Sequence, residues 1–178
     1  DKLRELQRAT KDFVEQSKNV AESDDRFDIG PTHSKDKPVL RRLKSPDTAS
    51  EAYWSFSKGL MAEVAEDLVG PNVIFHHSKL NFKWFDASDT VKWHQDIQFF
   101  PHTNYNVLTI GCYLSDTTMD NGPLAALPGS HQKDLFNQYD HKGNWTGMLS
   151  DKDAASLDAD SVEYMTGKSG SITIHNAR

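Results

Sequence analysis

The hydrophobic positions in the first part of the chain predict two helices. Residues 3–17 place apolar side chains at nearly helical spacing, with charged residues between them, and these are Leu3, Leu6, Phe13 and Val14. A second helix is expected to begin near Asp47 or Ser50, because apolar residues again recur three and four positions apart. Its apolar positions are Tyr53, Phe56, Leu60, Val64 and Leu68. The pair Gly70-Pro71 is a typical helix stop.

A polar segment separates the two helices, and strands are expected after them. Residues 21–46 contain Pro31, Pro38, Pro46 and Gly30, which predicts a long loop. From residue 72 onward, short aromatic and β-branched runs alternate with turn residues. The expected strands are residues 73–84, 91–97, 107–114, 124–127 and 171–175. Residues 141–160 are expected to form a loop with one short helix. Helices followed by strands predict a mainly β or α+β domain rather than alternating βαβ units.

Composition narrows the possible partners. A length of 178 residues favours one domain, and 26 acidic against 20 basic residues argue against a general binder of phosphate backbones. No apolar run is long enough to span a membrane, and the charged N-terminus does not resemble a signal peptide. The single cysteine, Cys112, excludes an internal disulfide framework. We therefore expect a cytoplasmic protein without a nucleic-acid or membrane partner.

The triplet His94-Gln95-Asp96 is the first candidate for chemistry. In an extended chain, residues i and i+2 point to the same side, so an imidazole and a carboxylate would converge on one point. This pair suits ferrous iron held by two histidines and one carboxylate, with positions left for a chelating cosubstrate and dioxygen. The alternative is an exposed His and Asp on the polar face of a strand, and the triplet alone does not decide between them.

Four sequence blocks occur in an order and spacing that resemble the phytanoyl-CoA dioxygenase family. They are Trp93-His94-Gln95-Asp96, Phe100-Pro101-His102-Thr103-Asn104, the run from Asn121-Gly122-Pro123 to Pro128-Gly129-Ser130-His131, and Gly170-Ser171-Ile172-Thr173-Ile174-His175. The resemblance covers roughly residues 72–178, and the run from Arg41 to Pro46 is similar to bacterial members. It implies a double-stranded β-helix, a jelly-roll or cupin-like fold, with N-terminal helices packed outside. Residues 1–178 would form a single oxygenase domain, with a helical and loop region at 1–71 and the β-helix core at 72–178.

The resemblance also implies roles for individual residues. His94 and Asp96 match the first two iron ligands and would be the catalytic residues. The residues that match contacts to the cosubstrate 2-oxoglutarate are Lys79, Asn81, Lys83, Gln95 and Cys112. Along residues 77–83, the alternation places the lysines and the asparagine on one face, which suits two carboxylates. A solvated strand face is the alternative for these residues, and a core position is the alternative for Cys112.

Two family residues are expected beyond the last residue of the chain. The second iron histidine of the family falls two positions after Arg178, and the arginine that pairs with 2-oxoglutarate falls further on. We therefore expect the chain to be incomplete at its C-terminus. His175 is an alternative ligand, although the family pattern places it before the ligand. His131, which follows the Pro128-Gly129-Ser130 turn, is expected to be structural.

The function expected from this resemblance is that of an Fe(II)- and 2-oxoglutarate-dependent dioxygenase. It would hydroxylate an unidentified small organic substrate with dioxygen and release succinate and CO2. The alternative is a non-catalytic β-helix module that binds a small ligand. The basic cluster of Arg41, Arg42 and Lys44 is expected in a loop that, by the resemblance, would cover the mouth of the pocket. There it would contact an anionic substrate group or steady the loop as a lid, and a solvated basic patch is the alternative.

Overall fold

The chain divides into two compact units, residues 1–88 and 89–178. A computed structural model describes residues 1–84 and 90–178, and each unit is described by itself. β3 (Lys79–Asn81) pairs with β2 (Leu40–Lys44) in the first unit. The unit boundary therefore falls later than the expected region boundary between residues 71 and 72.

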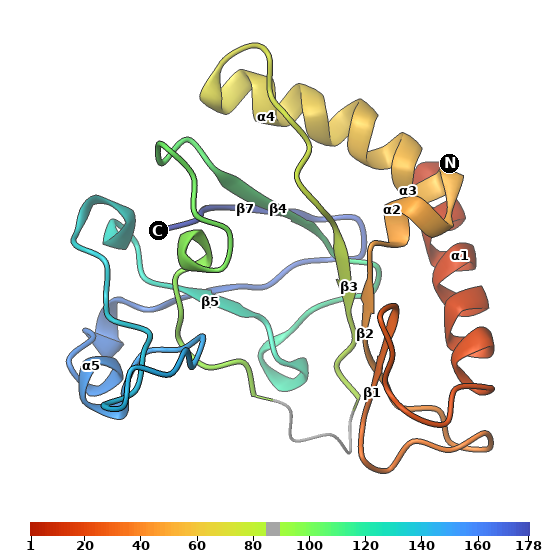
Figure 1. Ribbon diagram of the computed structural model, residues 1–178. Coiled ribbons are helices and arrows are strands. Elements are labelled where there is room, and N and C mark those ends of the chain that lie inside the picture. Colours follow the sequence, from red (N-terminus) through yellow and green to blue (C-terminus); the bar gives the residue numbers. More distant parts are fainter. Residues whose placement is uncertain (85–89) are drawn as a thin grey trace. The chain divides into compact units, whose positions relative to one another are not determined.

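Helices make up much of the first unit (Figure 1). They are α1 (Lys2–Ser17), α2 (Pro46–Ala49), α3 (Glu51–Phe56) and α4 (Ala62–Val69), with a π-helical turn (Ser57–Met61) between α3 and α4. Both predicted helices are thus confirmed. The second helix is irregular at Gly59, whose φ of −96° and ψ of −111° are not helical. It ends at Gly70, whose φ of 98° suits a residue without Cβ.

The contact between α1 and α3 explains the spacing of their apolar residues. Phe13 on α1 lies 6.0 Å from Tyr53 on α3, measured between ring centroids. The hydroxyls of Thr10 and Tyr53 are 2.5 Å apart and share a hydrogen bond. α1 also contacts β2, where Leu40 and Leu43 are completely buried. The core of this unit therefore lies between α1, α3 and one face of the sheet.

The sheet of the first unit corrects the prediction of a long loop at residues 21–46. This segment contains β1 (Phe27–Ile29) and all of β2, which with β3 form an antiparallel sheet in the order β1-β2-β3. The prediction failed because a β-bulge breaks the period of two: Leu40 and Leu43 are both buried although they are three positions apart. The basic cluster consequently lies on a strand, not in a loop. Of the strand expected at residues 73–84, only Lys79–Asn81 pairs.

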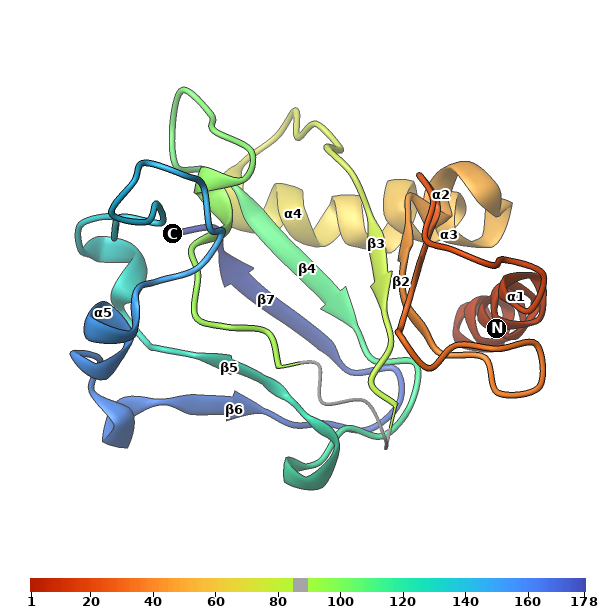
Figure 2. The same ribbon diagram turned by 60° about the horizontal axis from the view of Figure 1, so that its bottom comes forward.

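The second unit contains two antiparallel pairs of strands (Figure 2). β4 (Leu108–Cys112) pairs with β7 (Ile172–Asn176), and β5 (Leu124–Ala126) pairs with β6 (Glu163–Met165). The expected strands at 107–114, 124–127 and 171–175 are confirmed, whereas β6 was not expected. One short α-helix, α5 (Asp151–Ala155), interrupts residues 141–160, as expected. The short 3₁₀-helices are Asp96–Gln98, Met119–Asn121, Ser130–Gln132 and Ala159–Ser161.

The strand expected at residues 91–97 is absent from the described residues, so that prediction was wrong. The segment does not form a ladder with one neighbour, because its backbone groups bond to separate parts of the unit. The Trp93 carbonyl accepts from the N–H of Leu149, and the Ile97 N–H donates to the carbonyl of Ala177. Ile97, Leu149 and Ala177 are themselves buried and form the core around this segment.

The described residues form a mixed α and β structure with small sheets and no closed barrel. The α+β part of the expectation is therefore confirmed, whereas the double-stranded β-helix remains a prediction at this point. None of the helices in residues 1–84 and 90–178 combines the length and the apolar character needed to cross a membrane.

Candidate metal centre

The ring of His94 is oriented by its backbone surroundings. Its Nδ1 lies 2.7 Å from the carbonyl oxygen of Lys92. Since a carbonyl can only accept, Nδ1 carries the hydrogen of this bond, and Nε2 of the neutral ring carries a lone pair. Phe99 packs edge-to-face against the same ring, with centroids 5.6 Å apart. The protein therefore holds His94 with Nε2 presented as an electron-pair donor.

The carboxylate of Asp96 faces this donor. Its Oδ1 lies 3.2 Å from Nε2 of His94. Its Oδ2 accepts a hydrogen bond from the Thr109 hydroxyl at 2.7 Å and lies 3.4 Å from Nε2 of His175. Burial raises the pKa of Asp96, but its contacts with His175, His94 and Thr109 outweigh burial and hold the pKa well below its usual value. Asp96 is therefore an ionised and largely buried carboxylate.

Nε2 of His94 and Oδ1 of Asp96 face each other in a way that a positive charge between them would stabilise. A lone pair on Nε2 and a carboxylate oxygen repel each other at 3.2 Å unless a proton or a metal ion joins them. Two ligands that bind one first-row ion at ~2.1 Å and at right angles are ~3 Å apart. The observed separation fits two adjacent metal ligands, so the structure brings together the pair that the triplet predicted.

The sheet of β4 and β7 supplies the groups behind Asp96. Thr109 and His175 are directly opposite each other in the register, so both side chains lie on the same face. Nδ1 of His175 is buried and, within the part of the chain that the structure describes, has no hydrogen-bond partner. This matches a ring whose Nε2–H donates to Asp96. The described residues contain no group of three or more His, Cys, Asp or Glu side chains able to hold a metal ion.

Thr109 was not among the predicted site residues. Its contact with Asp96 joins positions 13 residues apart in the chain, and no short motif records it. The alternation of the expected strand at 107–114 would have placed Thr109 and Cys112 on opposite faces. If Asp96 is assigned to the face of β4 that carries Thr109, the two residues become neighbours. This alternation is the sequence signal from which Thr109 could have been predicted.

Gln95 and Cys112, two predicted contacts of the cosubstrate, lie in different environments. The Gln95 side chain is buried, and its Oε1 accepts from the N–H of Phe136 at 2.8 Å. Cys112 is half-buried, and by the alternation of β4 and β7 it lies on the face of Ile110 and Ile174 rather than that of Thr109. Burial raises the pKa of its thiol. The cosubstrate contacts expected for both residues stay predictions.

A protein-family model matches the whole chain. The model described as "Phytanoyl-CoA dioxygenase (PhyH)" matches residues 1–178. The chain belongs to the phytanoyl-CoA dioxygenase family.

The chain is also similar to proteins described as dioxygenases and hydroxylases. Over 166 residues the chain is 34% identical to a probable alpha-ketoglutarate-dependent hypophosphite dioxygenase of Stutzerimonas stutzeri, which covers 89% of the chain and 56% of that protein. It is 35% identical over 71 residues to an L-proline trans-4-hydroxylase of Streptomyces griseoviridis, covering 38% and 26% of the two chains. The family member described here thus spans little more than half of the first relative.

Solved structures show the same fold. The crystal structure of EctD from S. alaskensis with 2-oxoglutarate and 5-hydroxyectoine superimposes with a TM-score of 0.79 at 22% identity. The match covers 99% of this chain and 60% of that chain. A second EctD structure, with bound Fe, gives a TM-score of 0.77 over the same shares.

The remaining predicted residues of this family member lie in the first unit. Lys79, Asn81 and Lys83 are exposed, whereas Leu80 and Phe82 between them are half-buried. The alternation expected along residues 77–83 is therefore present. Because each unit is described by itself, the proximity of these three side chains to Asp96 stays a prediction.

Proposed function

We propose that the protein is an iron(II)- and 2-oxoglutarate-dependent dioxygenase that hydroxylates a small organic substrate and releases succinate and CO2. The observation that carries the proposal is the approach of Nε2 of His94 to Oδ1 of Asp96, with Nδ1 already engaged by the Lys92 carbonyl. Membership of the phytanoyl-CoA dioxygenase family and the names of the relatives support it. The likeness to EctD supports a double-stranded β-helix as the fold.

In this proposal, His94 and Asp96 hold the iron. Thr109 and His175 hold Oδ2 of Asp96, so that Oδ1 remains directed toward the position shared with His94. When bound, the iron and its keto-acid cosubstrate supply the oxidising chemistry with dioxygen. The contribution of the protein is to fix the ligands and to limit the access of water, and the side chain of Asp96 is only 11% exposed.

The cosubstrate would contact the open face of β3. The ammonium groups of Lys79 and Lys83 and the amide of Asn81 are donors that suit the two carboxylates of 2-oxoglutarate. We also propose that Gln95, which follows His94 directly, and Cys112 contact 2-oxoglutarate.

The test uses the protein at its natural length and compares Asp96→Ala and His94→Ala with the wild type. We expect both variants to lose iron binding and succinate formation, whereas Asp134→Ala, which removes an exposed carboxylate of the same unit, leaves both unchanged. Iron binding is measured anaerobically by calorimetry, and succinate by its release from 2-oxoglutarate. Wild-type turnover by Asp96→Ala would refute the assignment. A wild-type protein that binds ligands but forms no succinate would favour the non-catalytic module instead.

A further inference from the structure

One face of the sheet in the first unit is open and carries an unusual set of charges. The other face is covered, since Leu40 and Leu43 on β2 are completely buried. The open face of β2 and β3 carries exposed side chains only, and these are Arg42, Lys44, Lys79, Asn81 and Lys83. The chain has 26 acidic and 20 basic residues, so two strands whose open face carries three cations and no carboxylate, with Lys83 just after β3, differ from the overall composition.

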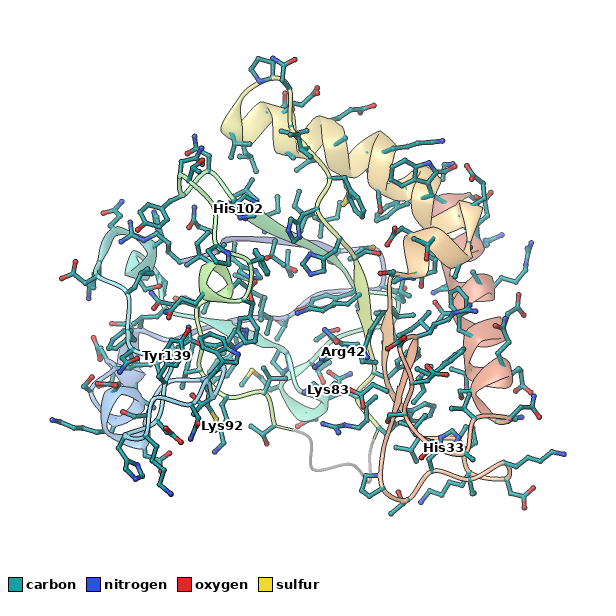
Figure 3. All side chains as sticks on the ribbon, in the orientation of Figure 1. His33, Arg42, Lys83, Lys92, His102 and Tyr139 are labelled. Carbon is teal, nitrogen blue, oxygen red and sulfur yellow. The ribbon has the colours of Figure 1, made fainter. Side chains whose placement is uncertain are left out.

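The register brings these side chains next to one another. Arg42 is directly opposite Asn81, and Lys44 is directly opposite Lys79. Opposed residues in an antiparallel pair have Cβ atoms roughly 5 Å apart, and like charges in such a pair destabilise the sheet. Lys83 lies two residues after Asn81, and Figure 3 labels both Arg42 and Lys83. A sheet that tolerates this repulsion is suited to bind an anion there.

Two acidic groups near this face, Asp28 and Asp24, have partners other than Arg42, although the Asp24 carboxylate also attracts Lys44. Asp28 on β1 is opposite Arg42 in the register, but its Oδ1 lies 3.9 Å from Nη1 of Arg41. The Asp24 carboxylate accepts from the backbone N–H groups of Arg26 and Phe27. In residues 1–84 and 90–178, the structure shows no ion pair between a carboxylate and Arg42 or Lys79.

We propose that Arg42 and Lys44 form the subsite for a small anionic substrate, a carboxylate or a phosphorus oxyanion, beside the cosubstrate on β3. The inference rests on the proposed function, because it takes Lys79 and Asn81 as contacts of 2-oxoglutarate. The guanidinium of Arg42 presents parallel N–H groups that match the two oxygens of such an anion. Lys44 adds a second cation on the same strand, two residues away, while one of its hydrogens is donated to the Asp24 carbonyl at 3.0 Å. The substrate and the keto acid would then bind side by side, as their reaction requires.

The experiment measures anion binding to the natural-length protein loaded with Fe(II) and 2-oxoglutarate without oxygen. The probes are hypophosphite, phosphite and propionate, with uncharged propionamide as the neutral comparison. For at least one anion, we expect Arg42→Gln to weaken binding by about 10- to 100-fold, with Lys44→Gln weaker in effect. Arg42→Lys keeps the charge without the paired N–H groups and should lie between Arg42→Gln and the wild type. Lys35→Gln, an exposed cation of the same unit, should match the wild type.

Three results would overturn the inference. One is that no anion binds the wild type more tightly than propionamide. Another is that Arg42→Gln and Lys35→Gln bind the anions equally. The third is that the anions compete with 2-oxoglutarate, because the cations would then serve the cosubstrate alone. The inference and the proposed function fail separately: succinate formation without anion binding refutes only the subsite, whereas anion binding without succinate formation refutes only the dioxygenase.

Discussion

The hydroxyl of Thr109 offers the most direct test of how the candidate centre is built. It donates to Oδ2 of Asp96 at 2.7 Å, which is the shortest contact of this carboxylate. Thr109→Val replaces the hydroxyl with a methyl group of similar size and keeps a β-branched residue in β4. The substitution therefore removes one hydrogen bond and leaves the packing nearly unchanged. We expect the variant to fold and to bind iron more weakly.

The size of the effect follows from the charge on the acceptor. A hydrogen bond to a charged group contributes about 1.5–3 kcal/mol, and each 1.4 kcal/mol corresponds to a factor of ten in affinity. Loss of a partner behind a metal ligand costs about 10–100-fold in affinity, which is the same range. His175 cannot compensate fully, because its Nε2 lies 3.4 Å from the same oxygen, beyond the usual range for such a bond. We therefore expect the Kd for iron to rise about 10- to 100-fold.

The assay is an anaerobic titration of Fe(II) into the natural-length protein, followed by calorimetry. Thr109→Ser keeps the hydroxyl and should bind iron nearly as tightly as the wild type. Thr173→Val is the matched control, because Thr173 lies on the same face of the β4–β7 pair, opposite Gly111. Thermal unfolding of each variant without metal separates stability from affinity. If Thr109→Val bound iron like the wild type while Asp96→Ala did not, the orientation of Asp96 would not depend on this bond.

Two further predictions concern stability and are checked by urea unfolding without metal. Gln95→Met leaves the half-buried N–H of Phe136 without its acceptor, so we expect a loss of about 1–3 kcal/mol in the free energy of unfolding. An unchanged midpoint would show that this N–H finds another partner. The Asp24 carboxylate accepts from the backbone N–H groups of Phe27 and Arg26, which lower its pKa below the usual 3.8. Its ionised form therefore stabilises the fold above pH ~4, and this contribution is lost as the pH falls through the lower pKa of the folded state. The stability difference between wild type and Asp24→Asn should accordingly shrink between pH 7 and pH 3, and a constant difference would contradict the reasoning.

Local patterns predicted the helices and several strands, but not the bulged strand β2. Helical spacing was sufficient for α1, because Leu6 and Phe13 report one buried face directly. The bulge in β2 places Leu40 and Leu43 on the buried side at a spacing of three, which resembles a helix or a loop in the sequence. Only the pairing with β1 and β3 defines this strand, and pairing is not visible from local residues.

The convergence of His94 and Asp96 was predicted for a reason that holds although the segment is not a strand. His94 and Asp96 were expected to converge because a strand places residues i and i+2 on one side. Among the described residues the segment pairs with no strand, yet Gln95 between them is extended, with φ −121° and ψ 118°. The convergence depends on this backbone conformation and not on a ladder. By contrast, Thr109 and His175 meet Asp96 only through the β4–β7 register, which joins distant parts of the chain.

The surroundings of Asp96 explain why a cation bound beside its carboxylate would stabilise the protein. Burial of a carboxylate costs free energy unless its oxygens are well bonded or paired with a positive charge. Among its contacts with the described residues, that from Thr109 has the length of a good hydrogen bond, while those to His94 and His175 are 3.2 and 3.4 Å long. Oδ1 in particular faces a nitrogen whose hydrogen, in the neutral ring, lies on the other side, toward the Lys92 carbonyl. Oδ2 of Asp96 and Nδ1 of His94 thus have hydrogen-bond partners of their own. Oδ1 of Asp96 and Nε2 of His94 face each other and would be stabilised by a positive charge that both contact. An ion bound there would satisfy both atoms at once, and this is the physical reason to regard the pair as a metal site and not as a surface ion pair.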